Sequence, residues 1–523
     1  MVFWLIVSRI QLEIRDFEGL KHTIRGGQLL KQIIINCTGR EARVAMLEGG
    51  RLVELYIERP EGRRIVGNIY KGRVENVLPG MQAAFIDIGM EKNAYLYVAD
   101  CLPPETEPEE GKRPSINELI TQGQEIIVQV SKEAFGTKGA KVTTQLSLPG
   151  RYIVYLPNVT YIGVSRRIRK EKERERLRRM AREILGPNEG IIIRTMAEGM
   201  SRAELEADVS FLRACWEQVW SEKKHVRPPA LVYQDLDLVS RVVRDFVDEE
   251  VEEIMIDSRP RYAEVRALLA RYRPEWEQKI RLYTGAEEIF SYYGLDGEIE
   301  RALRRKVWLK SGGYLVIDQT EAMTVFDVNT GKYTGSHTLE ETVLKTNLEA
   351  CREIVRQLRL RNIGGIVIID FIDMEKEENR LQVLECMEGE LRKDKTKTQV
   401  LGFTRLGLLE LTRKKERQNL ADILLRVCPC CEGTGRITAE ETLASALERE
   451  LASFSHDDRV EAVLLEVHPH IARVFVERDY IEELRNSTSI ALYIAENSAL
   501  DQQRYRILFA GSEAEARRRL QKQ

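Results

Sequence analysis

The sequence predicts a multidomain protein of mixed α+β and α/β architecture, on three observations. At 523 residues the chain is too long for one compact domain, because domains commonly hold about 150 residues. Hydrophobic residues make up 43% of the chain, which is enough to bury several cores. Short strand-like runs fill residues 67–144, whereas strands alternate with a long helix after residue 307, a pattern typical of layered α/β packing.

The composition restricts the classes of function. The 80 Lys and Arg residues nearly balance the 83 Asp and Glu residues, so the net charge is −3 and any basic binding surface must be local. The apolar run at residues 2–7 is far shorter than the ~20 residues of a membrane span, and no small-x-small cleavage site follows it. Eight cysteines are ordinary for a reducing compartment. We therefore expect a cytoplasmic protein without a membrane segment or a disulfide framework.

The N-terminal part is expected to form an extension, a sheet and a barrel. We expect residues 1–31 to be a weakly packed extension that arises from an upstream start codon. The run Ile33-Ile34-Ile35 and the alternation over residues 42–57 predict strands of a sheet. Over residues 67–144, short β-branched and aromatic runs between Gly, Pro and Asn turns predict a small Greek-key barrel with a loop near residues 103–114.

The middle of the chain is predicted to be mainly helical. Residues 166–182 hold ten Lys and Arg against three Glu, which fits either a solvated helix with Glu–Arg pairs or a phosphate-facing surface. Residues 200–310 are expected to be helical apart from a strand at residues 253–257. The acidic run at residues 248–253 is interpreted as an exposed helical face rather than a metal site.

Strands and a helix alternate after residue 307. Apolar runs at residues 314–318 and 323–329 predict two strands, and an apolar stripe predicts a helix over residues 339–361 that Gly364 and Gly365 end. A buried strand at residues 366–369 then leads into Asp370. After about residue 440 we expect a small mixed domain, in which the sequence shows no chemical signature.

Two aspartates follow strongly apolar strand patterns. Asp327 lies in Val-Phe-Asp-Val-Asn and Asp370 ends Ile-Val-Ile-Ile. A carboxylate among apolar residues is costly unless a cation or a donor compensates it. Asn329 is expected on the same side as Asp327. Hard oxygen ligands without nearby His or Cys indicate Mg²⁺, although strand-end aspartates can equally cap turns.

A cysteine knuckle follows at Cys428-Pro429-Cys430-Cys431. Cys428 and Cys431 have the C-x-x-C spacing of a zinc knuckle, but the chain has no second such pair, and His468 and His470 are about 40 residues away. Two chains that each donate one knuckle would complete four ligands. A redox dithiol and unligated thiols remain alternatives, and Cys430 is either a substitute ligand or a bystander.

The predicted barrel combines aromatic and basic residues. Phe85 and Tyr95 lie in its strands, with Lys71, Arg73 and Lys138 nearby. Aromatic rings that stack bases beside cations that hold phosphates form a platform for single-stranded nucleic acid. The alternative is that these rings belong to the barrel core.

One further strand ends in Arg194 and Thr195, a guanidinium and a hydroxyl that suit a terminal phosphate, although arginine at a strand end is commonly just exposed. The sequence has no P-loop, no G-x-G-x-x-G and no G-x-S-x-G motif. We therefore expect no nucleotide cofactor.

In this order the motifs resemble the ribonuclease E/G family, most closely its short form without a scaffold tail. The resemblance runs from about Gln32 to Arg436. The stretches that carry it are Asn68–Gly72, Ala83–Phe85, Ile193–Thr195, Leu282–Gly285, Gly312-Gly313, Asp318, Thr320–Ala322, Asp327–Asn329, Gln357–Arg361, Asp370–Met374 and the cysteine knuckle.

The resemblance implies a Mg²⁺-dependent endoribonuclease that cuts single-stranded RNA and leaves a 5′-phosphate and a 3′-hydroxyl. It assigns Asp327 and Asp370 to the metal, Asn329 to the scissile phosphate and Asp373 to the metal shell. It also implies roles in ribosomal RNA processing and mRNA decay. The alternatives are a non-catalytic RNA-binding or ribosome-associated protein and a zinc-organised structural oligomer.

The resemblance assigns binding residues as well. Phe85, Tyr95, Lys138 and Lys71 would grip the RNA. Arg194, Thr195, Val154 and Lys397 would form a 5′-monophosphate sensor. Cys428 and Cys431 would hold a Zn²⁺ ion shared between chains in a homodimer or homotetramer. Lys397 replaces an arginine of the family, so a weaker monophosphate preference is expected. Without the scaffold tail, direct recruitment of degradosome partners is not expected.

The domains implied by the resemblance are an N-terminal extension (residues 1–31), an RNase H-like subdomain (32–63 and 240–302), an S1-type OB barrel (64–144), a 5′-sensor region (145–239), a DNase I-like catalytic domain (303–424), a zinc-link (425–437) and a small C-terminal domain (438–523).

Overall fold

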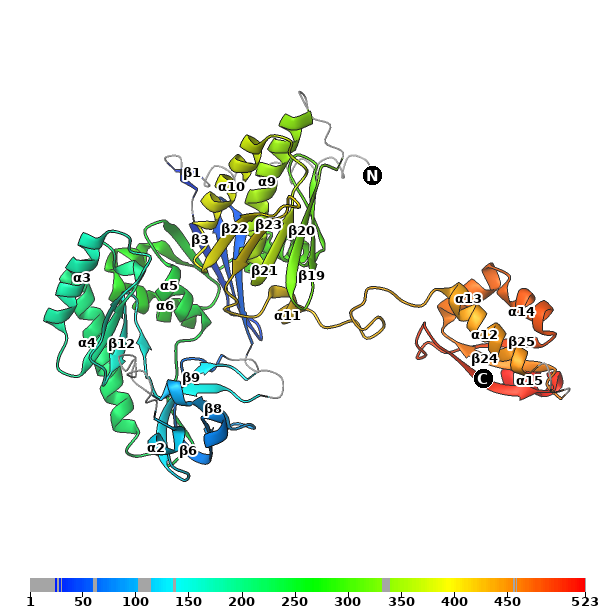
Figure 1. The fold of residues 1–523 in the computed structure, drawn as a ribbon, viewed down its shortest axis with the longest axis horizontal. Coiled ribbons are helices and arrows are strands. Elements are labelled where there is room, and N and C mark those ends of the chain that lie inside the picture. The colour runs from blue at the N-terminus through cyan, green and yellow to red at the C-terminus, as the bar shows by residue number, and fades with distance from the viewer. Residues whose placement is uncertain are drawn as a thin grey trace. The chain divides into compact units, whose positions relative to one another are not determined.

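The computed structural model describes residues 24–25, 28–29, 31–59, 64–101, 114–134, 138–331, 339–454, 457 and 459–522. Most of the extension expected at residues 1–31 and of the loop expected near residues 103–114 lies outside these ranges. The chain divides into two compact units, residues 1–423 and 424–523, which together form a mixed α/β multidomain protein (Figure 1). Among the described residues, no helix is long and apolar enough to cross a membrane.

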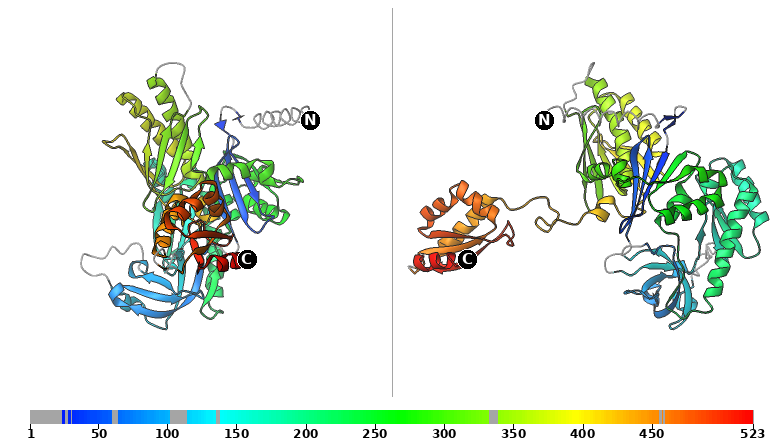
Figure 2. Two further views of the ribbon diagram at one scale, coloured as in Figure 1. Left: turned by 90° about the vertical axis from the view of Figure 1, so that its right-hand side faces the viewer. Right: turned by 180° about the vertical axis from the view of Figure 1, so that it is seen from behind.

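A five-stranded sheet in the first unit joins two segments that are far apart in the sequence. Its strand order is β17-β16-β3-β4-β5, and β16 lies parallel to β3. In Figure 2 the blue strands near the N-terminus lie beside the green helices α5 and α6. The strands are β3 (Lys31–Asn36), β4 (Ala42–Glu48), β5 (Arg51–Glu58), β16 (Val251–Ile256) and β17 (Ile280–Leu282). The helices of this part are α5 (Leu238–Phe246), α6 (Arg259–Tyr272), η5 (Pro274–Lys279), α7 (Ile289–Tyr292) and α8 (Leu295–Leu303).

This sheet contradicts two expectations. Residues 200–310 are not helical apart from one strand, because β17 lies in this sheet and strands also form at residues 230–233 and 306–308. The acidic run at residues 248–253 does not form a helical face, because β16 begins at Val251. Its acidic residues form separate ion pairs: Glu249 pairs with Arg273, and Glu250 pairs with Lys31. Long-range strand pairing overrides the local helical spacing of these charges.

Five strands close into a barrel. Its order is β6-β7-β8-β10-β9, β6 also pairs with β9, and β15 (Ala230–Tyr233) extends β6. Gly72 is required in β6, because a Cβ there would lie 2.6 Å from Ile86 Cγ2. The barrel elements are β6 (Ile69–Leu78), η2 (Pro79–Met81), β7 (Ala83–Asp87), β8 (Ala94–Tyr97), η3 (Val98–Asp100), α2 (Ile116–Leu119), β9 (Glu125–Lys132) and β10 (Lys141–Thr143).

A four-stranded sheet follows the barrel, with strand order β11-β12-β14-β13. The helix expected at residues 166–182 is α3, which begins at Glu171 and ends at Ile184. The elements are β11 (Leu148–Pro149), β12 (Ile153–Pro157), β13 (Ile162–Val164), α3 (Glu171–Ile184), β14 (Glu189–Ile193), η4 (Thr195–Ala197) and α4 (Arg202–Glu222). Arg174, Arg176 and Arg178 pair with Glu171 and Glu173 within α3, so part of its positive charge is balanced locally.

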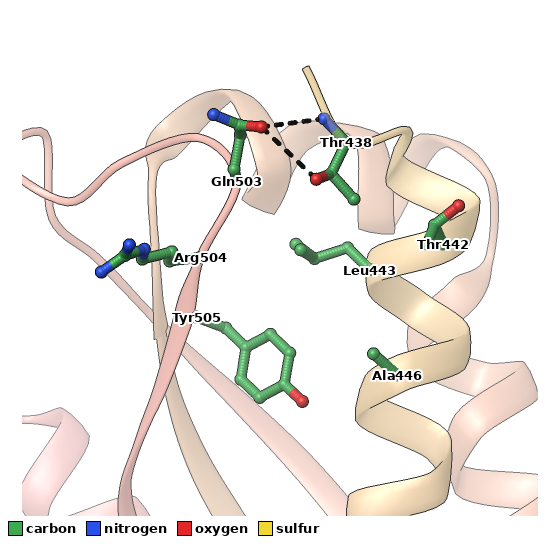
Figure 3. A pocket seen from close by; sticks show the side chains of 7 residues that line it. All are labelled: Thr438, Thr442, Leu443, Ala446, Gln503, Arg504 and Tyr505. Atoms are coloured by element: carbon green, nitrogen blue, oxygen red, sulfur yellow. Dashed lines mark hydrogen bonds between the residues drawn. The ribbon is translucent and has the colours of Figure 1, made fainter. Parts of the chain in front are cut away.

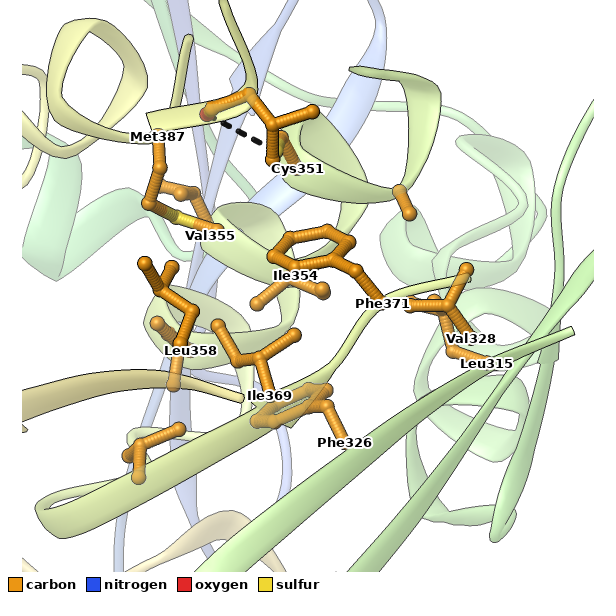
Figure 4. Packing of buried hydrophobic residues seen from close by; sticks show 14 of the residues in the cluster. Leu315, Phe326, Val328, Cys351, Ile354, Val355, Leu358, Ile369, Phe371 and Met387 are labelled. Atoms are coloured by element: carbon orange, nitrogen blue, oxygen red, sulfur yellow. Dashed lines mark hydrogen bonds between the residues drawn. The ribbon is translucent and has the colours of Figure 1, made fainter. Parts of the chain in front are cut away.

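The last sheet of the first unit is covered on one face by α9 and α10, as Figures 1 and 4 show. Its order is β18-β19-β20-β21-β23-β22. Phe326 and Ile369 pack against Ile354 and Leu358 of α9 on the covered face. The elements are β18 (Lys306–Trp308), β19 (Tyr314–Gln319), β20 (Met323–Asn329), α9 (Leu339–Leu360), β21 (Gly365–Asp370), α10 (Glu377–Leu391), β22 (Thr398–Phe403), β23 (Leu409–Arg413) and α11 (Leu420–Leu424).

Helix α9 connects this sheet to the first one. The buried guanidinium of Arg359 donates hydrogen bonds to Glu48 and Glu54 of the five-stranded sheet. The helix ends at Leu360, one residue before the expected end, and Asn362 rather than a glycine takes the first left-handed conformation after it, with φ of 50°.

The second unit contains a three-stranded sheet in the order β25-β24-β26. Its core includes Leu447, Val463, Leu465 and Phe475. The elements are α12 (Glu440–Phe454), β24 (Ala462–Val467), α13 (Pro469–Glu477), α14 (Tyr480–Thr488), β25 (Ala491–Glu496), β26 (Tyr505–Gly511) and α15 (Glu513–Leu520).

Candidate catalytic and nucleic-acid-binding sites

The two aspartates singled out in the sequence meet across neighbouring strands. Asp327 on β20 and Asp370 at the end of β21 are direct register partners in a parallel pair. Neighbouring strands lie about 4.8 Å apart, and partners of this kind point to the same face. Their neighbours Phe326 and Ile369 are fully buried under α9, so the aspartates lie on the opposite face. This is the face that α9 and α10 do not cover.

The charges of this pair act on each other. The pKa of Asp370 is raised above its ordinary value, first by burial and then by the charges of Asp327 and Asp373. Asn329 donates a hydrogen bond from Nδ2 to Asp327 Oδ2 at 2.9 Å, which orients that carboxylate. Asp373 is exposed on the loop that follows β21.

A buried amide holds this loop, and sequence analysis did not identify it. Asn347 of α9 has no exposed surface. Its Nδ2 donates to the carbonyl of Ile372 at 2.8 Å, and its Oδ1 accepts from the Ile372 N–H at 3.2 Å. Asn347 therefore sets the path of the chain between Asp370 and Asp373. The available signal was a polar residue inside the apolar stripe of α9.

The donor set of this face fits a hard divalent cation. Two adjacent carboxylates repel each other, and a cation between them relieves that repulsion. Within the described part of the chain, no three His, Cys, Asp or Glu side chains converge into a closed metal cage. Mg²⁺ binds through one or two carboxylates and keeps several waters, so Asp327 and Asp370 suffice for it.

The barrel presents aromatic rings on its outer surface. Phe85 and Tyr95 are direct partners on β7 and β8, with ring centroids 6.0 Å apart in an edge-to-face arrangement. Both rings are partly exposed, whereas the neighbouring Ala84 and Leu96 fill the core. The core interpretation of these rings is therefore wrong.

Cations lie beside these rings, including two that sequence analysis did not select. Lys141 is the strand partner of Tyr95, and Lys132 is the partner of Lys141. Lys138 is exposed in the segment before β10. Two of these lysines are already paired. Lys141 Nζ lies 2.7 Å from Asp100 Oδ2, and Lys71 Nζ lies 2.9 Å from Glu125 Oε2 and donates to the Val226 carbonyl at 3.0 Å. Their charges are balanced in this structure.

Arg194 and Thr195 lie where β14 ends. Arg194 Nη1 donates to the Gly150 carbonyl at 2.6 Å and to Asp245 Oδ1 at 2.7 Å. Thr195 Oγ1 shares a hydrogen bond with Ser165 Oγ at 2.9 Å. Val154 lies on the adjacent strand β12, opposite Ile192.

The loop that carries Lys397 reaches the same region. Lys395 Nζ donates to the carbonyl of Asp245 at 3.2 Å, and Arg167 donates to the carbonyl of Lys395. Lys397 is exposed two residues further on. Asp245 and Lys395 could not be found from the sequence, because no local pattern links residues that far apart.

A buried ion pair anchors this loop. Arg413 Nε donates to Asp394 Oδ2 at 2.7 Å, and both side chains are almost fully buried. Asp394 Oδ1 also accepts from the Thr396 N–H at 2.9 Å. The ends of the loop are thereby held in place next to the Arg194 region.

The cysteine knuckle lies in the second unit as a turn before α12. The pKa of the Cys428 thiol is lowered by backbone N–H groups of Cys431 and Cys430 and by the Cys431 thiol. Burial raises the pKa of Cys430. The thiols of Cys428 and Cys431 thus contact each other, whereas the charges of Asp501, Cys428 and Cys431 further raise the pKa of Cys430.

A glutamine connects the knuckle to the folded core of the second unit. Gln503 Nε2 donates to the Cys430 carbonyl at 2.6 Å, and Gln503 Oε1 accepts from the N–H of Thr438 at 3.1 Å. Figure 3 shows Gln503 at the rim of a hollow of about 350 Å³ whose walls include Leu443 and Tyr505. His468 and His470 are engaged elsewhere, since His468 caps α13 and His470 contacts Glu440.

The chain matches known protein families over most of its length. Residues 147–416 match the family described as Ribonuclease E/G family. Residues 427–511 match the one described as RNase E/G, Thioredoxin-like domain. The second match covers the region in which sequence analysis predicted only a small domain.

Individual relatives are similar over long alignments. The chain is 46% identical to ribonuclease G of Escherichia coli (strain K12) over 447 residues, which cover 84% of this chain and 91% of that protein. It is 44% identical to ribonuclease G of Haemophilus influenzae over 453 residues, 86% of this chain and 92% of that protein. Ribonuclease E of Haemophilus influenzae is 35% identical over 479 residues, which cover 90% of this chain and 51% of that protein.

Proposed function

The chain belongs to the ribonuclease E/G family, and from that premise we propose that it is an endoribonuclease whose catalytic centre is the Asp327–Asp370 pair. The observation that carries the proposal is the register of β20 and β21, which sets the two carboxylates side by side on the open face of the sheet. The substrate is single-stranded RNA, and the products carry a 5′-phosphate and a 3′-hydroxyl.

Each residue of the centre has a separate role in this proposal. Asp327 and Asp370 hold Mg²⁺, and Asn329 orients Asp327 through its 2.9 Å hydrogen bond while its second amide hydrogen is directed to the scissile phosphate. Asp373 adds negative charge beside the metal. A bound Mg²⁺ supplies activation of water and neutralises charge on the phosphodiester.

The outer surface of the barrel binds the RNA strand. Phe85 and Tyr95 stack bases, and Lys138 holds a phosphate, with Lys71 supporting the strand from its ion pair with Glu125. Lys141, the strand partner of Tyr95, adds a second lysine, which pairs with Asp100 as Lys71 pairs with Glu125. Such a platform tolerates many sequences, because every base has a π-face.

The region around Arg194 senses the 5′ end. Arg194, Thr195 and Val154 contribute from the four-stranded sheet, and Lys397 contributes from the loop after α10. The preference for a monophosphate is modest for two reasons. Asp245 already pairs with Arg194, and Lys397 offers a point charge rather than a planar fork.

Zinc joins two chains through the knuckle. Cys428 and Cys431 of each chain donate two thiolates, and four thiolates complete a tetrahedral site. The lowered pKa of Cys428 supports this role, because the thiolate is the form that binds zinc. The assembly is a homodimer or a homotetramer.

The subdomains follow the family pattern. We infer that the five-stranded sheet is RNase H-like, the barrel is an S1-type OB fold and the sheet that carries Asp327 is DNase I-like. We propose residues 32–63 with 240–302, 64–144 and 303–424 for these three subdomains, residues 145–239 for the 5′-sensor region and residues 425–437 for the zinc-link. The cellular roles are ribosomal RNA processing and mRNA decay in the cytoplasm.

One cleavage experiment tests the catalytic proposal. A 3′-labelled single-stranded RNA with a 5′-monophosphate or a 5′-triphosphate is incubated with the protein, with and without Mg²⁺. We expect cleavage only with Mg²⁺, and Asp327→Asn should abolish cleavage while RNA affinity stays near the parental value. Glu300→Gln is the matched control, because it removes one exposed carboxylate of α8, which pairs with Arg304 just after that helix.

The outcomes separate the candidate functions. Parental cleavage by Asp327→Asn would show that the carboxylate pair is not the catalytic centre. RNA binding by the parent without any cleavage would instead identify a non-catalytic RNA-binding protein.

A further inference from the structure

An aromatic pair with a lysine lies at the edge of the catalytic sheet, outside every site described above. Trp308 on β18 and Tyr314 on β19 are direct register partners, with ring centroids 5.3 Å apart at 62°. Lys306 Nζ lies 4.1 Å from the Trp308 centroid and 3.4 Å from the Tyr314 centroid. Trp308 remains 63% exposed despite its size.

The strand register connects this pair to the catalytic residues. Trp308 is opposite Tyr314, and Tyr314 is in turn opposite Asn329. Directly opposed residues of neighbouring strands share a face at a spacing of about 4.8 Å. The aromatic pair therefore begins one strand away from Asn329, on the same open face as the proposed metal ligands.

Lys306 lies on the same face of β18, two residues before Trp308. Lys306 is opposite Val316, Val316 is opposite Asp327, and Asp327 is opposite Asp370. Lys306 thus lies two strand spacings, about 10 Å, from Asp327 and three from Asp370, while Tyr314 and Trp308 lie one and two spacings from Asn329.

These rings do not belong to the hydrophobic core of the sheet. The core lies on the other face, where Leu315, Phe326 and Val328 pack under α9. Single exposed apolar side chains are common, but here two rings adjoin each other with an ammonium against both. Aromatic rings that lie next to cations on an open sheet are the arrangement that stacks unpaired bases.

We propose that Trp308 and Tyr314 form a base-stacking subsite that seats an unpaired nucleotide of the RNA one or two positions from the scissile phosphate. Lys306 contacts the adjoining backbone phosphate. This subsite rests on the proposed function, and it adds to the barrel platform a second contact that acts next to the cut.

A hollow of about 510 Å³ adjoins Trp308 at the edge of the sheet, between the loop after β18 and helix α9. Its lining mixes the cations Arg51, Lys310, Lys345 and Arg352 with the carboxylates Glu349 and Glu353. Arg51 pairs with Glu353 at 3.0 Å, and Glu349 accepts from the N–H groups of Lys310 and Ser311. Because α9 covers the face opposite to Asp327, this hollow lies outside the proposed subsite.

RNA fits this surface better than a second protein chain. The cores of protein interfaces are depleted in lysine, whereas Lys306 lies at the centre of this patch and Lys310 lies next to it. Tyr314 of this patch is also the strand partner of Asn329, which lies two residues from Asp327, where an RNA strand must lie for cleavage. A protein partner at this place would block that strand.

The test removes single bases from the RNA and then single aromatic rings from the protein. Single-stranded RNAs of one sequence carry one abasic nucleotide, which is moved through the positions on both sides of the cleavage site. For the full-length parent with Mg²⁺, we expect one position near the cut at which loss of the base lowers kcat/KM by about 5- to 150-fold, the value of one stacked base.

The variants identify the partner of that base. Trp308→Ala should lower kcat/KM for the intact RNA by a similar factor, and removing the base at that position should then lower it no further. Trp308→Phe should keep most of the parental kcat/KM and most of its decrease with the abasic RNA. Trp220→Ala is the matched control, because Trp220 is also an exposed indole beside a lysine, Lys223, but lies on α4. It should leave the abasic profile unchanged.

The outcomes separate the two levels of the proposal. If the parent cleaves, Asp327→Asn does not, and Trp308→Ala keeps the parental abasic profile, the subsite is wrong while the catalytic proposal stands. If Trp308→Ala changes the mass of the assembly in light scattering but not single-turnover cleavage, the patch is a protein interface and the subsite is also wrong. Parental cleavage by Asp327→Asn removes the premise of both.

Discussion

Replacing Asn347 by alanine tests whether the loop between Asp370 and Asp373 sets the metal site. The side chain is fully buried, and its two hydrogen bonds to Ile372, at 2.8 and 3.2 Å, are the contacts by which it holds the loop. Alanine leaves one N–H and one carbonyl of Ile372 without these partners. At roughly 1–3 kcal/mol for each unsatisfied group, the free energy of unfolding should fall by about 2–6 kcal/mol.

The effect on cleavage should appear in the metal dependence. Loss of a group that orients metal ligands commonly lowers metal affinity by about 10- to 100-fold. In single-turnover cleavage of a labelled RNA, well below the melting temperature of the variant, the Mg²⁺ concentration at half-maximal rate should rise by that factor. The rate at saturating Mg²⁺ should recover at least in part, because Asp327 and Asp370 are unchanged.

Thr346→Val is the matched control for this experiment. Thr346 is equally buried in α9, but its hydroxyl donates to Thr342 within the same helix. It should lower stability without changing the Mg²⁺ requirement. If Asn347→Ala is destabilised but needs no more Mg²⁺ than the parent, the argument that Asn347 positions the metal ligands is refuted.

Three further predictions concern other parts of the chain. Cys431→Ser should lower the zinc content, measured by atomic absorption, and halve the assembly mass in light scattering, and an unchanged mass would count against a shared knuckle. Lys397→Arg should raise the preference for 5′-monophosphate over 5′-triphosphate RNA by roughly 2- to 10-fold, the effect of one added hydrogen bond, and an unchanged ratio would exclude this side chain from the sensor. Glu189→Gln should cost roughly 1–3 kcal/mol in urea unfolding at pH 7, because Arg213 binds both carboxylate oxygens at 2.7 Å. Arg213 lowers the pKa of Glu189 to about 2, so this contribution is complete above about pH 4.5 and should vanish as the pH falls toward 2; a pH-independent difference would contradict it.

Local sequence pattern predicted many of the elements correctly. Strand β20, which carries Asp327, has its expected bounds, and helix α9 ends one residue before its expected end. Their apolar periodicity is set by neighbours in the chain, so it can be recognised without the fold. The same holds for the C-x-x-C spacing of Cys428 and Cys431. The expected helical face at residues 248–253 failed, because pairing with β3 forms a strand there.

Local sequence pattern could not predict on which face of a sheet a side chain lies or with which distant residue it pairs. The outward position of Phe85 depends on how the barrel closes, and the neutralised charge of Lys71 depends on Glu125, which is distant in the sequence. Asn347 and Lys395 act through contacts with Ile372 and Asp245 that no local motif encodes.

The sequence by itself determined which residue types stand at the ends of which strands, because periodicity and turn residues are local properties. Only the tertiary structure decided that Asp327 and Asp370 are register partners, and that Trp308 and Tyr314 share their face. A shift of one residue in either strand would turn its side chains to the opposite face, and the packing of the whole sheet against α9 selects the register.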